Sequence, residues 1–428
     1  MNEAASTHQM KFILRALRHR NYRLFFGGQS VSLVGTWMQQ IAMSWLVYRL
    51  TDSPFLLGVV GFTSQIPALL FSPIAGVYAD RWNRYHLLIA TQSLASVQAF
   101  ILAFLTLSGI VQVWHLILLS FFLGVVNSFD MPIRQSFVVE MLERKEDLGN
   151  AIALNSSLFN GARLIGPSIA GIVIALVGEG ICFLLNAISF FAIIIALLAM
   201  RIPKREIRSG HTRLQEELKE GYRYIRDFIP IRYILLQLSL MSFMGMPYVV
   251  LLPVFARDIL HGGPHTLGFL MGGSGFGALM GALFLASRKT VLGMGRLIAL
   301  MSGVLGVGIV AFALSKVFLF SIVMMLVTGF SMMVQMVASN TILQTIVDED
   351  KRGRVMSFYA VSFMGVAPFG SLFAGSLASK IGAPDTLVIT GMCCILGALL
   401  FYRKLPEIRK VVRPIYQKMG IMPEAPPE

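Results

Sequence analysis

Long stretches of the chain carry no charged residue, and each is long enough to cross a lipid bilayer as a helix. A transmembrane helix needs about 20 predominantly apolar residues. Charge-free runs of this length occur at 24–48, 53–79, 180–200, 233–256, 259–287, 317–347 and 355–379. A longer run at 85–129 must hold two crossings, and further apolar segments lie near 148–178, 297–315 and 386–402. The pattern predicts an all-α membrane protein with twelve transmembrane helices.

The composition agrees with this pattern. Apolar residues make up 56% of the 428 residues, charged residues make up 14%, and the mean hydropathy is +0.71. A soluble protein normally has about 25% charged residues, so most of this chain belongs in lipid. The three cysteines lie in apolar segments and the histidines form no metal-ligand cluster. We therefore expect no disulfide framework, no metal and no cofactor.

The net charge of +14 is distributed unevenly across the predicted membrane. With a cytoplasmic N-terminus, four of the 36 Lys and Arg residues lie outside and two lie within the membrane, which leaves 30 on the inner side. This bias is the positive-inside rule. It predicts a multi-pass protein of a bacterial cytoplasmic (inner) membrane with both termini cytoplasmic. The basic surplus then faces membrane lipids, and we expect no nucleic-acid partner.

Small residues recur in the two halves of the chain at a nearly constant offset. Ala68, Ser72 and Gly76 return as Gly273, Gly277 and Gly281 at an offset of 205, and Gly166 and Gly171 return as Gly370 and Gly375 at 204. Such stripes let helices approach closely. The offset indicates an internal repeat of two pseudo-symmetric six-helix bundles, and transporters commonly place their substrate path between such repeats.

The repeat sets the predicted domain boundaries. They are a cytoplasmic basic N-terminus (1–21), an N-terminal bundle (22–200), a cytoplasmic linker (201–232), a C-terminal bundle (233–402) and a cytoplasmic tail (403–428). Within the linker, Leu214, Leu218, Tyr222 and Ile225 have helical spacing. This spacing predicts an amphipathic helix on the inner membrane face, with a solvated linker as the alternative.

Three charges fall inside predicted spans: Asp130, Arg134 and Arg163. A lone charge at mid-bilayer costs about 2.5–3.5 kcal/mol on insertion scales, so these three should be paired or hydrated. Asp130 and Arg163 lie at similar distances from the turn near 145–146, so their depths differ by roughly 3 Å. They could therefore pair, and Arg134 is one turn from Asp130 on the same helix.

Two interpretations of this charge group remain open. One is a buried ion pair that fixes two helices. The other is a proton- or substrate-coupling site, because Asp130 is the only acid deep in a span. Burial disfavours its charged form, whereas neighbouring arginines favour it.

Polar amides inside other spans are candidate cavity-lining residues: Gln39, Gln40, Gln237, Gln335 and Asn340. Glutamine at such a depth is costly unless its amide is hydrogen-bonded. Bonding between helices and lining of a wet cavity are both consistent with the sequence.

A polar hairpin separates the charge-free runs at 53–79 and 85–129. It carries Gly76, Asp80, Arg81 and Arg84, and it resembles the G-x-x-x-D-R-x-G-R signature of the major facilitator superfamily, with Asn83 at the usual last glycine. The resemblance implies an inner-gate motif. Gly76 would pack helix 2 against helix 11, and Asp80 would lie at the electropositive N-terminus of helix 11, with the two arginines as charge partners.

The segment A-R-L-I-G-P-S-I-A-G resembles the helix-5 signature G-x-x-x-G-P-x-x-G-G of antiporters in this superfamily. Gly166, Pro167 and Gly171 match it, and Ala162 and Ala170 replace two glycines. Proline bends a helix and small residues permit close packing. The resemblance implies a helix-5 packing motif.

Longer phrases, among them L-R-H-R-N-Y-R-L-F-F, G-T-W-M-Q-Q, N-A-I-A-L-N-S and R-G-R-V-M-S, resemble the secretion-effector branch of this superfamily, with the enterobactin exporter and the macrolide efflux proteins. The resemblance covers nearly the whole chain. It implies two bundles that rock about a central cavity, and a secondary transporter that exports a small amphipathic molecule in exchange for protons. A siderophore and a drug are equally admissible substrates, and we expect a monomer.

Two other functions remain open. One is uptake, or flipping of a lipid-like substrate, on the same fold, because no motif encodes direction. The other is a membrane sensor or scaffold. We expect no enzymatic activity, and the chain has no G-x-x-x-x-G-K-[ST] loop for ATP hydrolysis.

Overall fold

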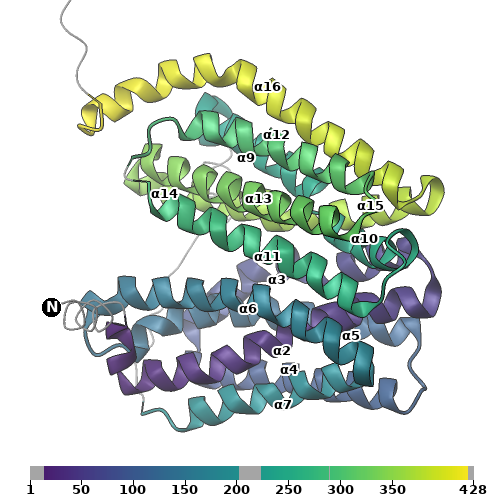
Figure 1. Cartoon of the computed structure of the whole chain (residues 1–428). Helices are drawn as coiled ribbons and strands as arrows, with labels where there is room; N and C mark the ends of the chain where they lie inside the picture. Colours follow the sequence, from purple (N-terminus) through teal and green to yellow (C-terminus); the bar gives the residue numbers. More distant parts are fainter. Residues whose placement is uncertain (1–13, 202–222, 289, 423–428) are drawn as a thin grey trace, which may run out of the picture. The chain divides into compact units, whose positions relative to one another are not determined.

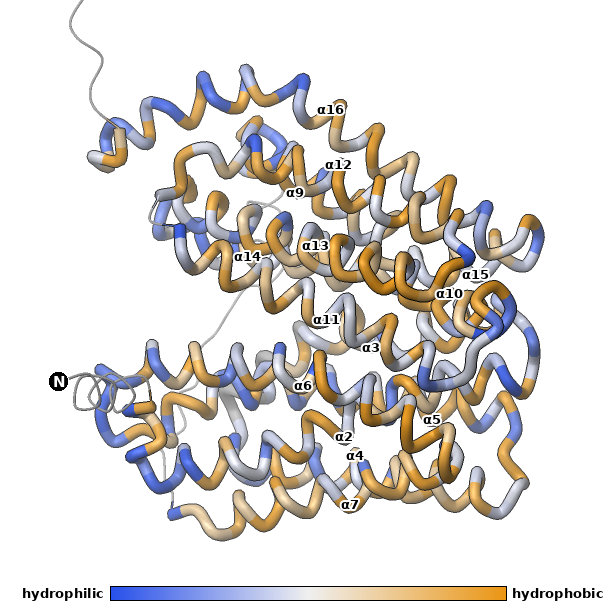
Figure 2. The backbone as a smooth tube through the Cα atoms, viewed as in Figure 1, coloured by the Kyte–Doolittle hydropathy of each residue, from blue (hydrophilic) through white to orange (hydrophobic). Residues whose placement is uncertain are grey.

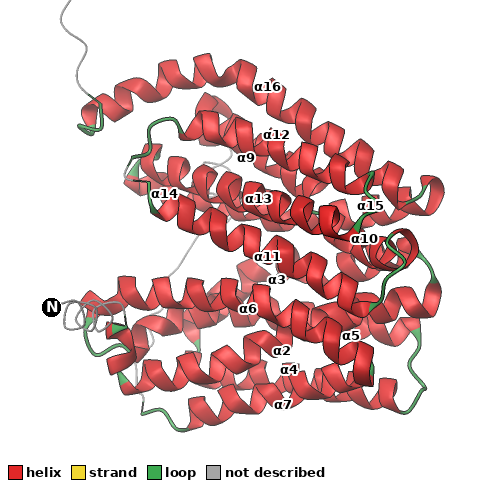
Figure 3. Cartoon of the chain, viewed as in Figure 1, coloured by secondary structure: helices red, strands yellow, loops and turns green. Residues whose placement is uncertain are grey.

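The computed structural model describes residues 14–201, 223–288 and 290–422. Within these ranges the side chains of 73, 76, 77, 79–81 and 350 are not described. All regular elements of the described ranges are helical (Figure 3). Most of the predicted linker (202–222) and the last six residues (423–428) lie outside the described residues, so the predicted amphipathic linker helix stays a prediction.

The described part of the first half forms six long helices, which can be followed in Figure 1. They are α2 (Arg20–Thr51), α3 (Pro54–Arg81), α4 (Arg84–Leu107), α5 (Val113–Phe137), α6 (Leu148–Val177) and α7 (Glu179–Leu198). Short helical turns precede α2 and connect α5 to α6: η1 (Arg15–Arg18), η2 (Val138–Met141) and η3 (Lys145–Asp147). The α4–α5 connection near Ser108 and Gly109 divides the run at 85–129 into the two crossings expected from its length, and Gly109 takes a positive φ of 73° there.

The second half repeats this arrangement with two interrupted helices. α9 (Ile229–Leu240), η4 (Met241–Gly245), α10 (Tyr248–Val254) and η5 (Phe255–Ile259) form one span, and α14 (Glu349–Ala360), η6 (Val361–Gly365) and α15 (Ala367–Ile381) form another. Both are interrupted by wide π turns, which commonly mark irregular points in long helices. The remaining helices are α11 (Pro264–Ala286), α12 (Met294–Ala313), α13 (Phe318–Ile346) and α16 (Ala383–Lys418).

The described chain holds eleven helical segments that are long and apolar enough to cross a membrane. α2 has 32 residues but carries polar residues throughout, including Gln29, Gln39 and Gln40, which lower its hydropathy. Counting α2, the structure has the twelve predicted spans. Hydrophobic residues follow the helix lengths, and hydrophilic residues gather at helix ends and in loops (Figure 2).

The chain separates into two compact units that largely follow the two halves. The first comprises 1–52, 63–210 and 261–272, and the second comprises 53–62, 211–260 and 273–428. Each unit therefore contains one half together with the beginning of one helix from the other half, either α3 or α11. The two borrowed segments are equivalent in the repeat, because α3 begins at Pro54 and α11 at Pro264.

Glycine contacts show the register of the repeat. A Cβ on Gly58 would meet the Ser371 carbonyl oxygen at 2.7 Å and Gly375 Cα at 3.0 Å, within the second unit. Within the first unit, a Cβ on Gly268 would meet the Pro167 carbonyl oxygen at 2.5 Å and Gly171 Cα at 3.0 Å. The two contacts are equivalent, at offsets of 204 for Gly171 and Gly375 and 210 for Gly58 and Gly268.

The offset of 204 predicted for Gly171 and Gly375 is therefore confirmed. The offset of 205 predicted for the small residues of α3 and α11 is wrong. These helices begin 210 residues apart, as do α4 and α12, which start at Arg84 and Met294. The error has a simple cause. Small residues recur along both helices, so a shift of five residues still aligns small residues with small residues.

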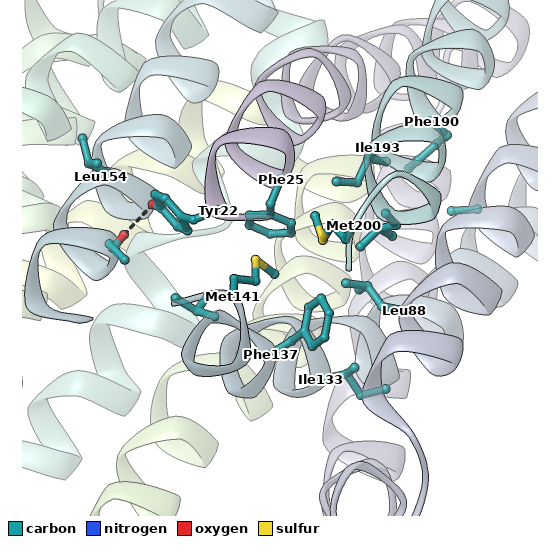
Figure 4. Packing of buried hydrophobic residues seen from close by; sticks show 14 of the residues in the cluster. Tyr22, Phe25, Leu88, Ile133, Phe137, Met141, Leu154, Phe190, Ile193 and Met200 are labelled. Atoms are coloured by element: carbon teal, nitrogen blue, oxygen red, sulfur yellow. Dashed lines mark hydrogen bonds between the residues drawn. The ribbon is translucent and has the colours of Figure 1, made fainter. Parts of the chain in front are cut away.

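The N-terminal half is held together by one apolar cluster, most of which is drawn in Figure 4. Tyr22 and Phe25 of α2 pack near Phe137 at the end of α5, and Ile193 of α7 completes the same core. The Tyr22 hydroxyl donates a hydrogen bond of 2.8 Å to the Ala151 carbonyl of α6. This bond gives the buried phenol the partner that a polar group needs in an apolar core.

The last helix, α16, extends beyond the predicted apolar segment at 386–402 and ends at Lys418. Its apolar residues Leu405, Ile408, Val412 and Tyr416 are buried in the C-terminal core cluster. Their spacing of three to four residues makes one apolar face. Burial of this face maintains the helix through Pro406 and Pro414, so the first part of the predicted tail (403–428) is helical.

We predict that Gly277→Ala destabilises the protein. A Cβ at Gly277 of α11 would overlap the Leu326 carbonyl oxygen of α13, and backbone cannot move aside as a side chain end can. Overpacking of this kind costs about 1–3 kcal/mol. The apparent melting temperature in detergent should fall by several degrees. The control is Gly353→Ala in α14, where a Cβ meets no atom within 4 Å; an unchanged melting temperature for Gly277→Ala would refute this packing.

Candidate functional site

Asp130 is the centre of a buried polar group in the N-terminal half. Its side chain comes from α5 and is only 2% exposed. The Thr91 hydroxyl and the Gln92 amide of α4 donate hydrogen bonds to Asp130 Oδ1, at 2.9 and 2.6 Å. Arg134 Nη2 lies 2.7 Å from the other carboxylate oxygen. The carboxylate therefore accepts hydrogen bonds from three donors, the partners that a buried acid inside a span needs.

The local sequence explains how this group assembles. Asp130 and Arg134 are four residues apart, which puts both on one face of α5. α4 packs directly against α5, and Thr91 and Gln92 are neighbouring polar residues of α4, a helix that carries no charge after Arg84. Neither residue was among the sites predicted from the sequence, although their polarity inside an apolar span is a signal that could have found them.

A cavity of about 50 Å³ opens beside Asp130. It is lined mostly by polar residues of α2, α4, α5 and α7, among them Gln29, Thr36, Gln92, Asn127, Asp130, Arg134 and Asn186. The side-chain oxygens of Gln29 and Gln92 are buried and accept no hydrogen bond from the described residues. A cavity of this volume and polarity has room for a few water molecules, which need such acceptors. The surroundings of Asp130 can thus be hydrated.

Arg163 is not the partner of Asp130. Its guanidinium lies over the ring of Trp37, 5.9 Å from the ring centre, and within the described chain it forms no ion pair. The depth predicted from the sequence depends only on distance along each helix. It does not say which neighbouring helix a side chain faces. α6, which carries Arg163, packs chiefly on α2, whereas α5 packs chiefly on α4. The two side chains are therefore on different helix pairs.

Gln39 and Gln40, adjacent in sequence, have opposite environments. Gln39 is buried and donates to Gln98 Oε1 of α4 at 3.0 Å, while Asn186 of α7 donates to Gln39 Oε1 at 2.7 Å. Gln98 donates in turn to the Leu119 carbonyl of α5 at 3.3 Å. Gln39 thus ties helices together, and it does not line the cavity beside Asp130. Gln40 is exposed.

The C-terminal half places an amide where the N-terminal half has its acid. α5 and α13 begin at Val113 and Phe318, an offset of 205, which brings Gln335 to the position of Asp130. Gln335 and Gln237 are buried, and the side-chain nitrogen of each lacks a hydrogen-bond partner in the described chain. Asn340, half-buried, accepts a hydrogen bond from Gln344. The two halves thus share a polar position but differ in charge.

The hairpin motif is described only in part. The surroundings of Gly76 and the side chains of Asp80 and Arg81 lie outside the described residues. Arg84 Nη1 lies 3.2 Å from Glu140 Oε1 at the end of the α5–η2 segment. In the helix-5 motif, Gly166 packs against Trp37, and Gly171 packs against Gly268. Pro167 lies within α6.

The comparisons with known proteins identify the family. A sequence model of transmembrane secretion effectors matches residues 13–419. The chain belongs to the transmembrane secretion effector family. This family is a branch of the major facilitator superfamily, as the motifs predicted, and the protein is a multi-pass membrane transporter of small molecules. Among the described residues, no group of three or more His, Cys, Asp or Glu could hold a metal.

Individual relatives of the secretion effector family share a quarter of their residues with this chain. It is 26% identical to the staphyloferrin A transporter of Staphylococcus aureus, over 89% of this chain and 95% of that one. It is 23% identical to macrolide efflux protein A of Streptococcus pyogenes, over 92% and 99%. It is 24% identical to the multidrug efflux pump Tap of Mycolicibacterium fortuitum, over 87% and 92%.

Solved structures of transporters have the same fold. A bacterial homologue of the human lysosomal transporter Spinster matches with a TM-score of 0.69 at 15% identity, over 92% of this chain and 98% of that one. A bacterial homologue of the iron transporter ferroportin matches with a TM-score of 0.68 at 17% identity, over 90% and 98%. These matches concern the fold alone, which is that of major facilitator transporters.

We predict that Gln39→Ala destabilises the protein and that Gln40→Ala does not. Loss of the Gln39 amide leaves buried groups of Gln98 and Asn186 unpaired, and each unpaired group costs about 1–3 kcal/mol. The Gln40 side chain is exposed and has no such partners. The apparent melting temperatures in detergent test this pair. Equal melting temperatures for the two variants would contradict a structural role for the Gln39 network.

Proposed function

We propose that this transporter exports a small amphipathic molecule across the bacterial cytoplasmic membrane in exchange for protons, and that Asp130 carries the proton. The observation that carries the proposal is the position of Asp130: a buried carboxylate inside a span, beside a polar cavity that can hold water. Intramembrane carboxylates in such surroundings commonly serve as proton relays. A carboxylate that only clamped two helices would not need the cavity.

The contacts of Asp130 suggest how protonation acts on the helices. The charged carboxylate holds Arg134 of its own helix together with Thr91 and Gln92 of α4. A proton on Asp130 removes the charge that holds the Arg134 guanidinium. It also occupies one of the positions at which the carboxylate accepts hydrogen bonds. The α4–α5 contact then weakens and Arg134, which is 27% exposed, becomes free to take another partner. Proton binding thereby changes the packing of the N-terminal half.

The relatives support export and bound the substrate class. Proteins named for a siderophore, staphyloferrin A, and for drugs, the macrolides, match over nearly the whole chain. We therefore infer a siderophore-like or drug-like substrate. From the positive-inside bias we infer that both termini are cytoplasmic, and we propose that the protein works as a monomer. The gate role of Gly76, Asp80 and Arg81 stays a prediction from the family resemblance.

We predict that Asp130→Asn abolishes proton coupling. Purified protein is placed in liposomes with an internal pH dye and tested with a panel of siderophores and macrolides. The unmodified protein should move protons when a substrate is present, and Asp130→Asn should reduce this movement at least tenfold. Substrate-dependent proton movement at the normal rate in Asp130→Asn would remove the coupling role of Asp130.

The matched control is Glu179→Gln. Glu179 is another buried carboxylate of the N-terminal half with an arginine partner, because Arg49 Nε lies 2.7 Å from its Oε1. It does not line the cavity beside Asp130. Each substitution removes the ion pair of a buried carboxylate. Both variants should therefore lose thermal stability, but only Asp130→Asn should lose proton movement. If the unmodified protein transported substrate without any proton movement, its function as a transporter would stand and the proposed antiport would be refuted.

A further inference from the structure

Arg163 is a charged residue in the middle of a span that no acid of the described chain neutralises. It lies 15 residues after the start of α6 at Leu148, in a helix of 30 residues. At 1.5 Å per residue this is about 22 Å along the helix, near its centre. Its guanidinium contacts the Trp37 ring and forms no ion pair or hydrogen bond in the described chain. An intramembrane arginine normally has a partner.

The aromatic side chains around Arg163 are held in place by helix packing. Gly166 of α6 lies against Trp37, where a Cβ would approach the Trp37 Cβ to 2.6 Å. This close approach brings the indole under the guanidinium. Phe159, one turn before Arg163, meets the Trp37 ring edge-on with 5.8 Å between ring centres. A cation over an aromatic face is favourable, but the ring does not neutralise the charge.

The same face of the N-terminal half also carries an exposed amide. Gln40 is three residues after Trp37 on α2, which places the two on one side of that helix. Gln40 is exposed and forms no hydrogen bond in the described chain, and Phe159 is 47% exposed. An amide and a guanidinium at this depth would be costly against lipid tails. This face therefore borders water or a bound polar molecule.

We propose that Arg163, Trp37, Phe159 and Gln40 form the substrate subsite for a carboxylate group on an amphipathic molecule. Guanidinium binds carboxylate through two parallel hydrogen bonds, which fixes both position and charge. The two aromatic rings would pack the apolar part of the same molecule, and the Gln40 amide would bind a further polar group. The substrate carboxylate supplies the counter-ion that the protein does not.

Four described acids of this half already have basic partners. Asp130 is held by Arg134, Glu140 lies with Arg84, and Glu179 lies with Arg49. Asp147 is held by Arg15 at 3.0 Å and by His19 at 2.9 Å. The subsite is also distinct from the cavity beside Asp130, whose lining does not include Arg163. The inference rests on the proposed export for its biological meaning, but binding tests it without transport.

The test uses Trp37 as the reporter. In a protein with Trp45, Trp82 and Trp114 replaced by Phe, Trp37 is the only tryptophan, because the chain has four. The ligands are 7-methoxycoumarin-3-carboxylate and its carboxamide, a matched pair that differs in charge and whose ring accepts energy from tryptophan. Quenching of Trp37 emission in detergent gives both affinities. We expect the carboxylate to bind at least tenfold more tightly than the carboxamide, because its bond to arginine is charge-assisted.

Substitutions of Arg163 decide the assignment. Arg163→Gln should remove the preference for the carboxylate, and a cooperative thermal unfolding transition in detergent shows that the variant is folded. Arg163→Lys should retain part of the preference, since lysine keeps the charge but not the two-pronged geometry. Equal affinities for the two ligands in the unmodified site, or a preference that survives Arg163→Gln, would overturn the proposal. Displacement of the carboxylate by phosphatidylglycerol but not by phosphatidylcholine would assign Arg163 to a lipid headgroup and also overturn it.

Asp130→Asn separates this proposal from the coupling proposal. The variant should keep the carboxylate preference at the Arg163 subsite while losing proton movement in liposomes. A carboxylate preference without proton coupling in the unmodified protein would refute the antiport and leave the subsite in place. Proton coupling without a carboxylate preference would refute the subsite and leave the antiport in place.

Discussion

The interaction on which the N-terminal half depends is the hydrogen-bonded ion pair of Asp130 and Arg134. A charge inside a bilayer must be paired or hydrated, and Asp130 has both an arginine and two neutral donors from the adjacent helix. The hydrogen bonds from Thr91 and Gln92 join α4 to α5 within the span. Apolar packing has no direction of its own there, so these bonds fix how the two helices face each other. Because the pair depends on the charge of one carboxylate, a single proton can change how these helices are held.

Two buried clusters of polar residues in the N-terminal half illustrate the difference between a structural network and a candidate functional site. The network of Gln39, Gln98 and Asn186 is internally satisfied, so each amide finds its partner on another helix. Beside Asp130, by contrast, two buried glutamine oxygens at a cavity have no donor among the residues that the structure describes. A satisfied network rigidifies a core, whereas unsatisfied groups at a cavity indicate water or a ligand. Arg163 belongs to the second kind, because its charge has no counter-ion in the described chain.

Much of the fold could be predicted from the sequence, because charge-free runs report membrane spans directly and small-residue stripes reveal the repeat. The register of α3 and α11 could not, since Gly, Ala and Ser align equally well after a shift of five residues. The expected pairing of Arg163 with Asp130 was wrong for another reason: depth along a helix is readable from sequence, but rotation about its axis is not. Thr91 and Gln92 were visible as polar residues, but only the α4–α5 packing shows that both point at Asp130.

The central claim is that Asp130 gains and loses a proton during transport. Infrared difference spectroscopy of the purified protein in lipid measures this directly, because a protonated carboxyl group has a carbonyl stretch that a carboxylate lacks. Addition of a transported substrate should change the intensity of one protonated-carboxyl band, and this change should be absent from Asp130→Asn. A substrate-induced band that remains in Asp130→Asn, or a substrate that is transported with no such band in the unmodified protein, would contradict the account.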